Sequence, residues 1–279
     1  MPLDTALRIE ENRHLGAAHF LLTLSAPPGS PPLPSWKAGQ FAMIGLGLPG
    51  PTNDPLLRRP FSIFEPPPQR QAPASSLRIF YKVLGRGTAL LARARPGTTV
   101  PCLAPLGNGF DPPRAAGSRL LLVAGGIGAA SLHPLAVQEL REGRSPLMLY
   151  GCRTAADLAG IAPSREAGIE VRVATDDGTA GASGRAGDLL DRFLRDEGPQ
   201  ASRRWIICAC GPHAMMRHAA QVAARHGVPC HVSLESPMAC GFGVCVGCVV
   251  GVRDGAGEPL RYRRICVEGP VFDAAVVAW

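Results

Sequence analysis

Residues 119–131 read RLLLVAGGIGAAS, an apolar run that ends in three closely spaced glycines. The run has the pattern of a short buried strand, and apolar residues then recur at helical spacing over residues 132–140. In such a strand–turn–helix, backbone amides and a helix N-terminus can hold a pyrophosphate. The candidate nucleotide contacts are Gly125, Gly126 and Gly128. Ser131 stands where the G-x-G-x-x-G pattern has its third glycine, so a tight turn without a ligand is an alternative.

The alternation of strand and helix continues toward the C-terminus. Strand patterns lie at residues 147–150, 170–174 and 205–209, and helical patterns lie at residues 186–195 and 213–226. Strands that alternate with helices form βαβ units and a parallel sheet. We therefore expect an α/β parallel-sheet nucleotide domain at residues 116–230.

The N-terminal part of the chain has short alternating strands and proline-rich loops instead. Strand patterns lie at residues 20–24, 41–44 and 77–83, and the proline-rich loops lie at residues 26–35 and 65–76. Many short strands without long helices indicate a small antiparallel barrel or sandwich. Because residues 111–118 look like a linker, we expect an antiparallel β-barrel domain at residues 1–115.

Four of the nine cysteines lie in residues 231–279, a glycine-rich segment that is too short for a core of its own. Their spacing, Cys240-x4-Cys245-x2-Cys248-x17-Cys266, is that of plant-type [2Fe–2S] ferredoxins. The interspersed glycines allow backbone amides to approach the sulfur atoms. A structural zinc site is the alternative, although zinc knuckles generally begin with C-x2-C. The other five cysteines have apolar surroundings typical of buried free thiols, and Cys210 and Cys230 are the reserve ligands.

The composition argues against several classes of function. Lys+Arg 29 against Asp+Glu 22 gives a net charge of +7, but the basic residues are nearly all scattered arginines. No basic run is interleaved with aromatic residues, so we expect no nucleic-acid binding. Glycines interrupt the most apolar stretch, residues 120–132, which is shorter than the about 20 residues of a membrane span. Residues 1–16 lack the apolar region of a secretory signal, which favours a cytoplasmic protein.

Two further segments are candidates for flavin contacts. Arg59-Pro60-Phe61-Ser62 combines an arginine with a hydroxyl, which can supply a phosphate contact and a polar contact to a flavin ring. An edge strand with an exposed arginine is the alternative. Gly85-Arg86-Gly87-Thr88 has the pattern of a turn before a helix, with Thr88 as its cap. Arg153, and no acidic residue, follows the second strand of the α/β half, which leaves the choice between NAD and NADP open.

Together these segments resemble the ferredoxin–NADP reductase superfamily along the whole chain. The motifs that carry the resemblance are Arg59-Pro60-Phe61-Ser62, Gly125-Gly126-Ile127-Gly128, and Cys210-Gly211-Pro212 with Met215-Met216. Within that superfamily, the chain is similar to the electron-transfer subunits of type B, NAD-dependent dihydroorotate dehydrogenases. This narrower resemblance rests on residues 175–178, 233–235, 238–249 and 266–272.

The resemblance implies FAD, a [2Fe–2S] cluster and NAD as cofactors, with NADP not excluded. It assigns FAD contacts to Arg59, Pro60, Phe61, Ser62, Phe80, Tyr81, Lys82, Gly87 and Thr88. It assigns NAD contacts to Gly125, Gly126, Gly128, Cys210, Gly211 and Pro212. The implied cluster ligands are Cys240, Cys245, Cys248 and Cys266.

The implied function is that of an accessory electron-transfer subunit in pyrimidine biosynthesis. Electrons would pass from dihydroorotate through FMN on a catalytic partner subunit, then through the cluster and FAD to NAD, in a heterotetramer. No side chain is expected to act as an acid or base, because the protein positions and tunes the cofactors. One alternative is an FAD/[2Fe–2S] NAD(P)H reductase subunit of another oxidoreductase, of the sulfide dehydrogenase, sulfite reductase or hydrogenase type. The other is a non-catalytic, zinc-stabilised binding protein.

Overall fold

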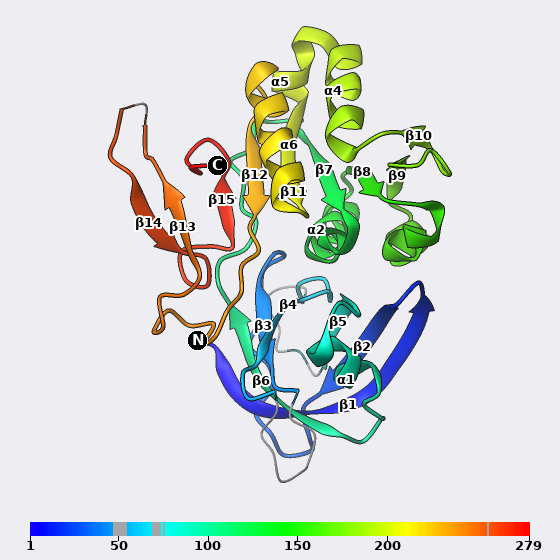
Figure 1. Ribbon diagram of the computed structural model, residues 1–279, viewed down its shortest axis with the longest axis vertical. Helices are drawn as coiled ribbons and strands as arrows, with labels where there is room; N and C mark the ends of the chain where they lie inside the picture. The colour runs from blue at the N-terminus through cyan, green and yellow to red at the C-terminus, as the bar shows by residue number, and fades with distance from the viewer. Residues whose placement is uncertain (47–54, 69–73, 75, 256) are drawn as a thin grey trace.

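The computed structural model describes residues 1–46, 55–68, 74, 76–255 and 257–279. Figure 1 shows an antiparallel barrel below an α/β lobe, with the C-terminal segment running along the side of both. This arrangement confirms the fold class expected from the sequence. No helix among these residues is both long and apolar enough to cross a membrane.

The barrel is a six-stranded antiparallel sheet with the order β4-β3-β6-β1-β2-β5. Its strands are β1 (Leu3–Gly16), β2 (His19–Ser25), β3 (Phe41–Ile44), β4 (Arg59–Ser62), β5 (Ser76–Lys82) and β6 (Thr99–Leu106), and helix α1 (Arg86–Ala92) follows β5. An antiparallel bridge between Ile63 and Ile79 brings the end of β4 to β5 and nearly closes the sheet. Alternate residues such as Leu22, Leu24 and Ile79 point inward and form the core of the barrel.

The α/β lobe contains a seven-stranded sheet with the order β10-β9-β8-β7-β11-β12-β15. Its strands are β7 (Arg119–Gly125), β8 (Leu147–Cys152), β9 (Glu170–Thr175), β10 (Ala182–Ser183), β11 (Trp205–Cys210), β12 (Cys230–Ser233) and β15 (Val271–Asp273). All neighbours are parallel except β12 and β15, which are antiparallel. The chain order reverses between β7 and β11, and ligands bind at such switch points in open α/β sheets.

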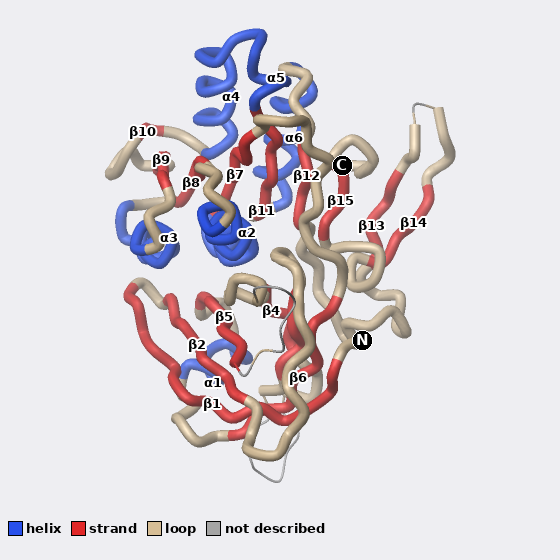
Figure 2. The backbone as a smooth tube through the Cα atoms, turned by 180° about the vertical axis from the view of Figure 1, so that it is seen from behind, coloured by secondary structure: helices blue, strands red, loops and turns tan. Residues whose placement is uncertain are grey.

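Helices cover both faces of this sheet. Its helices are α2 (Ala129–Arg141), α3 (Ala162–Glu166), α4 (Ala186–Glu197), α5 (Ala201–Arg204) and α6 (His213–Arg225), and the short 3-10 turns are η2 (Gly126–Gly128), η3 (Ala155–Ile161) and η4 (Gly198–Gln200). Apolar residues of α4 and α6 pack on one face, and those of α2 pack on the other. Helices α2 and α3 lie between the sheet and the barrel (Figure 2).

The C-terminal segment forms a two-stranded ribbon, β13 (Val249–Val252) and β14 (Arg261–Arg264), before β15 joins the large sheet. Its buried residues Cys248, Ile265 and Phe272 belong to the same apolar cluster as Phe41 of the barrel and Leu121 of the α/β sheet. The segment thus shares its core with the other two parts. The division at residues 115/116 and 230/231 stays a prediction, and β12 begins at Cys230.

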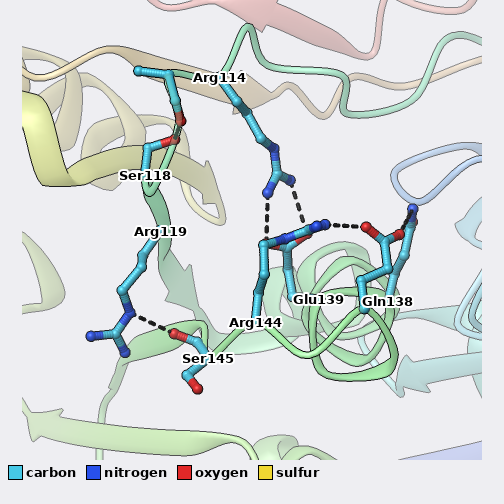
Figure 3. Close-up of polar contacts among 9 residues, drawn as sticks. Arg114, Ser118, Arg119, Gln138, Glu139, Arg144 and Ser145 are labelled. Carbon is cyan, nitrogen blue, oxygen red and sulfur yellow. Dashed lines mark hydrogen bonds and ion pairs between the residues drawn. The ribbon is translucent and has the colours of Figure 1, made fainter.

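The expected linker at residues 111–118 is fixed to the α/β lobe by a buried carboxylate. Arg114 and Arg144 each donate two hydrogen bonds to Glu139 of α2, over 2.7–2.9 Å (Figure 3). Burial acts to raise the pKa of Glu139, but the two guanidinium groups lower it below the ordinary value. Arg114 therefore holds the linker against α2, at the start of the α/β lobe.

Candidate active site and cysteine centre

A cleft of about 670 Å³ lies where the barrel, the α/β lobe and the C-terminal segment meet. Its barrel wall includes all nine residues that the sequence assigned to FAD: Arg59, Pro60, Phe61, Ser62, Phe80, Tyr81, Lys82, Gly87 and Thr88. Its other wall includes Ile127, Ala130 and Cys210 from the α/β lobe, and residues 233–238 with Pro270 from the C-terminal part. One cavity therefore collects residues that are far apart in the sequence.

Strand β4 and the start of α1 position the polar residues of the barrel wall. In β4, Pro60 is paired with Met43 of β3, which holds the Arg59–Ser62 segment at the rim of the barrel. Arg59 donates a hydrogen bond of 2.6 Å to the Leu57 carbonyl, so its guanidinium lies against its own loop. Gly85, and not Thr88, occupies the cap position of α1. The Thr88 hydroxyl instead accepts the amide of Gly85 from the third position of the helix.

The base of the cleft contains a thiol and a carboxyl group. The Sγ of Cys210, at the end of β11, lies 3.9 Å from Oε1 of Glu235. Burial raises the pKa of the Cys210 thiol, which stays protonated and uncharged at neutral pH. Next to it, the hydroxyl groups of Ser131 and Ser233 lie 3.3 Å apart and join α2 to β12. Ser131 is thus buried as a packing and hydrogen-bonding residue.

Residues 233–238 line the cleft, but the sequence analysis used residues 233–235 and Met238 only as marks of the resemblance and placed none of the six in a binding site. A signal for them exists, because they directly follow a parallel strand, and binding residues gather at the carboxyl ends of such strands. The sequence pattern did not identify β12, which has only four residues.

The glycines assigned to NAD lie beside the cleft, at the ends of β7 and β11. A Cβ atom on Gly128 would lie 2.2 Å from the Cys210 carbonyl oxygen, so only glycine allows this close approach. Gly125 packs in the same way against Pro212. Gly126 has a φ of +51°, and no atom lies within 4 Å of the position a Cβ would take. Packing alone explains Gly125 and Gly128, whereas the open face at Gly126 leaves space for a ligand.

Both signs of charge occur where the adenosine end of a dinucleotide would lie. Arg153 follows β8, and the amide of Asp177, after β9, bonds to its carbonyl oxygen at 3.3 Å. The carboxylate of Asp177 accepts from the amide and hydroxyl of Thr179. An acidic pair, Asp176 and Asp177, is thus present beside the arginine, directly after β9. The preference between NAD and NADP therefore stays open.

The four predicted cluster ligands gather as two pairs. The Sγ atoms of Cys240 and Cys245 lie 3.4 Å apart, and Cys266 lies within hydrogen-bonding reach of Cys248. Among the residues described, no three His, Cys, Asp or Glu side chains come together as ligands of a single metal ion. A [2Fe–2S] cluster takes two thiolates on each iron, so two pairs fit this cluster better than a tetrahedral zinc ion.

The backbone around Cys240 favours negative charge. Burial acts to raise its pKa, but amides of Cys245, Phe242 and Val244 point at the sulfur and lower the pKa of Cys240 to about 6. Burial and the neighbouring Cys248 raise the pKa of Cys266 to about 12. A Cβ on Gly241 would lie 2.4 Å from Met43 Cγ, so the cysteine loop packs directly on β3 of the barrel.

Known proteins are similar to this chain in both sequence and fold. Residues 235–278 match the model of the iron–sulfur cluster binding domain of dihydroorotate dehydrogenase B. The chain is 39% identical over 243 residues to the electron transfer subunit of dihydroorotate dehydrogenase B (NAD(+)) from Bacillus caldolyticus, covering 86% of each protein. It is 33% identical over 262 residues to the homologous subunit of Aquifex aeolicus, covering 94% of this chain and 93% of that protein.

The chain belongs to the family of electron transfer subunits of dihydroorotate dehydrogenase B. Among solved structures, it is similar to a chain of the NADH-dependent reduced ferredoxin-NADP oxidoreductase. In that comparison the TM-score is 0.76, the identity is 28%, and the match covers 98% of this chain and 90% of the other. The ferredoxin reductase of carbazole 1,9a-dioxygenase, at 21% identity and a TM-score of 0.65, shares the fold over 83% of this chain and 69% of its own. The expected superfamily and family are both confirmed, and these relatives do not favour a reductase subunit of another oxidoreductase.

Proposed function

We propose that this chain carries electrons between NAD and an FMN-containing dihydroorotate dehydrogenase subunit through FAD and a [2Fe–2S] cluster. The observation that carries the proposal is the continuity between the cleft and the cysteine loop. Residues 233–238 line the cleft, and Cys240, the first of the four candidate cluster ligands, lies only two positions after Met238. Pro60, on the opposite wall, is the strand partner of Met43, against which Gly241 packs.

In this proposal, the barrel wall of the cleft holds FAD. Arg59 supplies the positive charge for the diphosphate, and Ser62 and the aromatic residues Phe61 and Tyr81 face the ring system. When bound, the flavin exchanges two electrons with a nicotinamide and single electrons with an iron–sulfur cluster. The uncharged Cys210 thiol closes the base of the cleft, so the protein's part is to position the two rings and to exclude water.

The nicotinamide nucleotide enters from the α/β side. The η2 turn and the first turn of α2 present backbone amides for the pyrophosphate beside Gly126. The neighbouring Cys210–Pro212 loop, of which Cys210 lines the cleft, would hold the nicotinamide end. NAD is the nucleotide that the family name specifies, and the acidic pair at Asp176 and Asp177 is unfavourable for the extra phosphate of NADP.

The cysteine loop is also the site of contact with the catalytic partner. Phe242, Val244 and Val246 alternate with the cluster ligands and are 52%, 73% and 57% exposed. All three side chains are open to solvent. Exposed apolar residues around a redox centre suit a partner surface, because single-electron transfer requires the two centres to be close. The chain is thus an accessory subunit of a larger assembly, for which we propose a heterotetramer.

The test separates hydride transfer from orotate chemistry. The purified chain with its cofactors should oxidise NADH with a dye as acceptor, because flavin and nucleotide sites both belong to it. Mixing it with the cognate FMN subunit should produce NAD reduction that depends on dihydroorotate and that neither protein shows alone. Dihydroorotate oxidation coupled to NAD by this chain in isolation would refute the accessory role. A chain that binds neither flavin nor iron would refute the proposal as a whole.

A further inference from the structure

The residues that follow the fourth cysteine, 267–273, form a strap between the cluster and both walls of the cleft. One barrel residue, Asn108, makes four hydrogen bonds with it. The Asn108 amide group donates to the carbonyls of Glu268, at 2.9 Å, and Val271, at 3.2 Å. Its side-chain oxygen accepts the Val271 amide at 3.0 Å, and its own backbone amide donates to Gly269 at 2.7 Å.

The backbone next to Asn108 is equally close to the strap. A Cβ on Gly107 would lie 2.6 Å from Pro270 Cδ and 2.7 Å from the Gly269 oxygen. Gly107 also has a φ of +69°, so no other residue allows this approach without strain. Pro270, which is held here, lines the cleft itself and lies four residues after Cys266.

The far end of the strap is fixed to the α/β lobe. Its last three residues are β15, which pairs with β12 through Ser233 and Val271. The Leu234 amide also donates to the Pro270 carbonyl at 2.9 Å. The strap therefore connects Cys266 with the barrel through Asn108 and with the opposite wall of the cleft through β12.

We propose that Asn108 is a positioning residue, which fixes Cys266, and with it the cluster, at a set distance from the flavin cleft. The inference rests on the proposed function. The rate of single-electron transfer falls steeply with distance, so a small displacement of the strap slows this step without affecting hydride transfer. Only an amide side chain donates to two carbonyls and accepts an amide at this place. Since Asn108 is an exposed residue, its removal leaves no buried cavity.

The experiment compares Asn108→Ala with the wild-type protein, both loaded with flavin and cluster. In stopped-flow mixing with NADH, the flavin should be reduced at the wild-type rate, whereas reduction of the cluster should slow by about 10-fold. Hydrogen–deuterium exchange over residues 264–273 should rise, which is a readout independent of activity. Arg119→Ala is the control, because Arg119 also donates from its side chain to a backbone carbonyl, that of Ser145 at 2.9 Å, but lies at the start of β7, away from the strap and the cleft.

Equal rates of cluster reduction in Asn108→Ala and the wild type would overturn the inference. Slowing of the same size in Arg119→Ala would also overturn it, because general destabilisation would then explain the effect. If Asn108→Ala loses its cluster, Asn108→Asp takes its place in the measurement of cluster reduction. Its carboxylate still accepts the Val271 amide but repels the carbonyls of Glu268 and Val271, so the same slowing is expected. A wild-type cluster that NADH does not reduce would count against the proposed function and not against the role of Asn108.

Discussion

The Nζ atom of Lys82 in the barrel lies 2.7 Å from Oδ1 of Asp157 in the α/β lobe, and the two side chains are only 18% and 16% exposed. Lys82 is also one of the cleft residues assigned to FAD. Its charge is therefore engaged by the opposite lobe, and the ion pair joins the two lobes at one end of the cleft. The Lys82 ammonium lowers the pKa of Asp157 below the usual value.

Replacement of Asp157 by asparagine should destabilise the protein by about 1–3 kcal/mol, because a largely buried lysine loses its charged partner. Chemical denaturation of the two proteins measures this difference. Glu170→Gln is the control, since its pair with Arg172 lies on the surface, where ion pairs contribute about 0–1 kcal/mol. An Asp157→Asn variant no less stable than the control would show that the pair does not couple the lobes.

Glu139→Gln should lower the free energy of unfolding at neutral pH by about 2–3 kcal/mol, because Glu139 is 1% exposed and pairs with two arginines. This loss of free energy is smaller than for a fully buried ion pair because Arg144 is partly solvated. Since the folded pKa of Glu139 is lowered, its stabilisation is present above the unfolded pKa of about 4.3 and is lost as the pH falls through the folded pKa. Urea titrations from pH 7 to pH 3 should therefore show the two proteins converging. The exposed Glu142, another partner of Arg144, provides the control, and Glu142→Gln should cost under about 1 kcal/mol.

Arg59→Ala should weaken FAD binding by one to two orders of magnitude, which corresponds to a charge-assisted contact of about 1.5–3 kcal/mol. Fluorescence titration of the flavin-free protein gives the affinity. The neighbouring Arg58 provides a matched control, because it pairs with Asp4 at 2.8 Å and does not line the cleft. If both variants retain FAD equally well, the flavin contact lies elsewhere.

Cys245→Ser should abolish the cluster and leave the flavin in place. The wild-type chain, purified without oxygen, should contain about two irons and two acid-labile sulfides, as four-cysteine ligation of a [2Fe–2S] centre requires. Cys152→Ser is the control, since this thiol lies at the end of β8, in a different part of the fold. Iron and sulfide analysis measures the loss of the cluster, and the visible absorption spectrum shows whether the flavin remains. One zinc and no iron in the wild type would disprove the cluster.

Much of the fold could be predicted because its signals are local. Strands β3, β7, β8, β9 and β11 and helices α4 and α6 all appear as apolar patterns of period 2 or 3.6 or as short apolar runs. Strand β1 was missed although it has 14 residues, because only two of them are buried and the apolar pattern is weak. The four candidate cluster ligands could be proposed from their spacing, since an iron–sulfur centre constrains cysteines within one short segment of the chain.

The sequence by itself determined many of the strands and helices, the candidate motifs for phosphate and cluster binding, and the family to which the chain belongs. Only the tertiary structure decided that residues 233–238 and Pro270 complete the cleft, that Lys82 pairs with Asp157, and that Asn108 holds the strap. Asn108 and Val271 are 163 positions apart. Periodicity reports the environment of neighbouring residues, whereas such contacts depend on how two sheets and a C-terminal segment pack, because close packing brings distant residues together only in the complete fold.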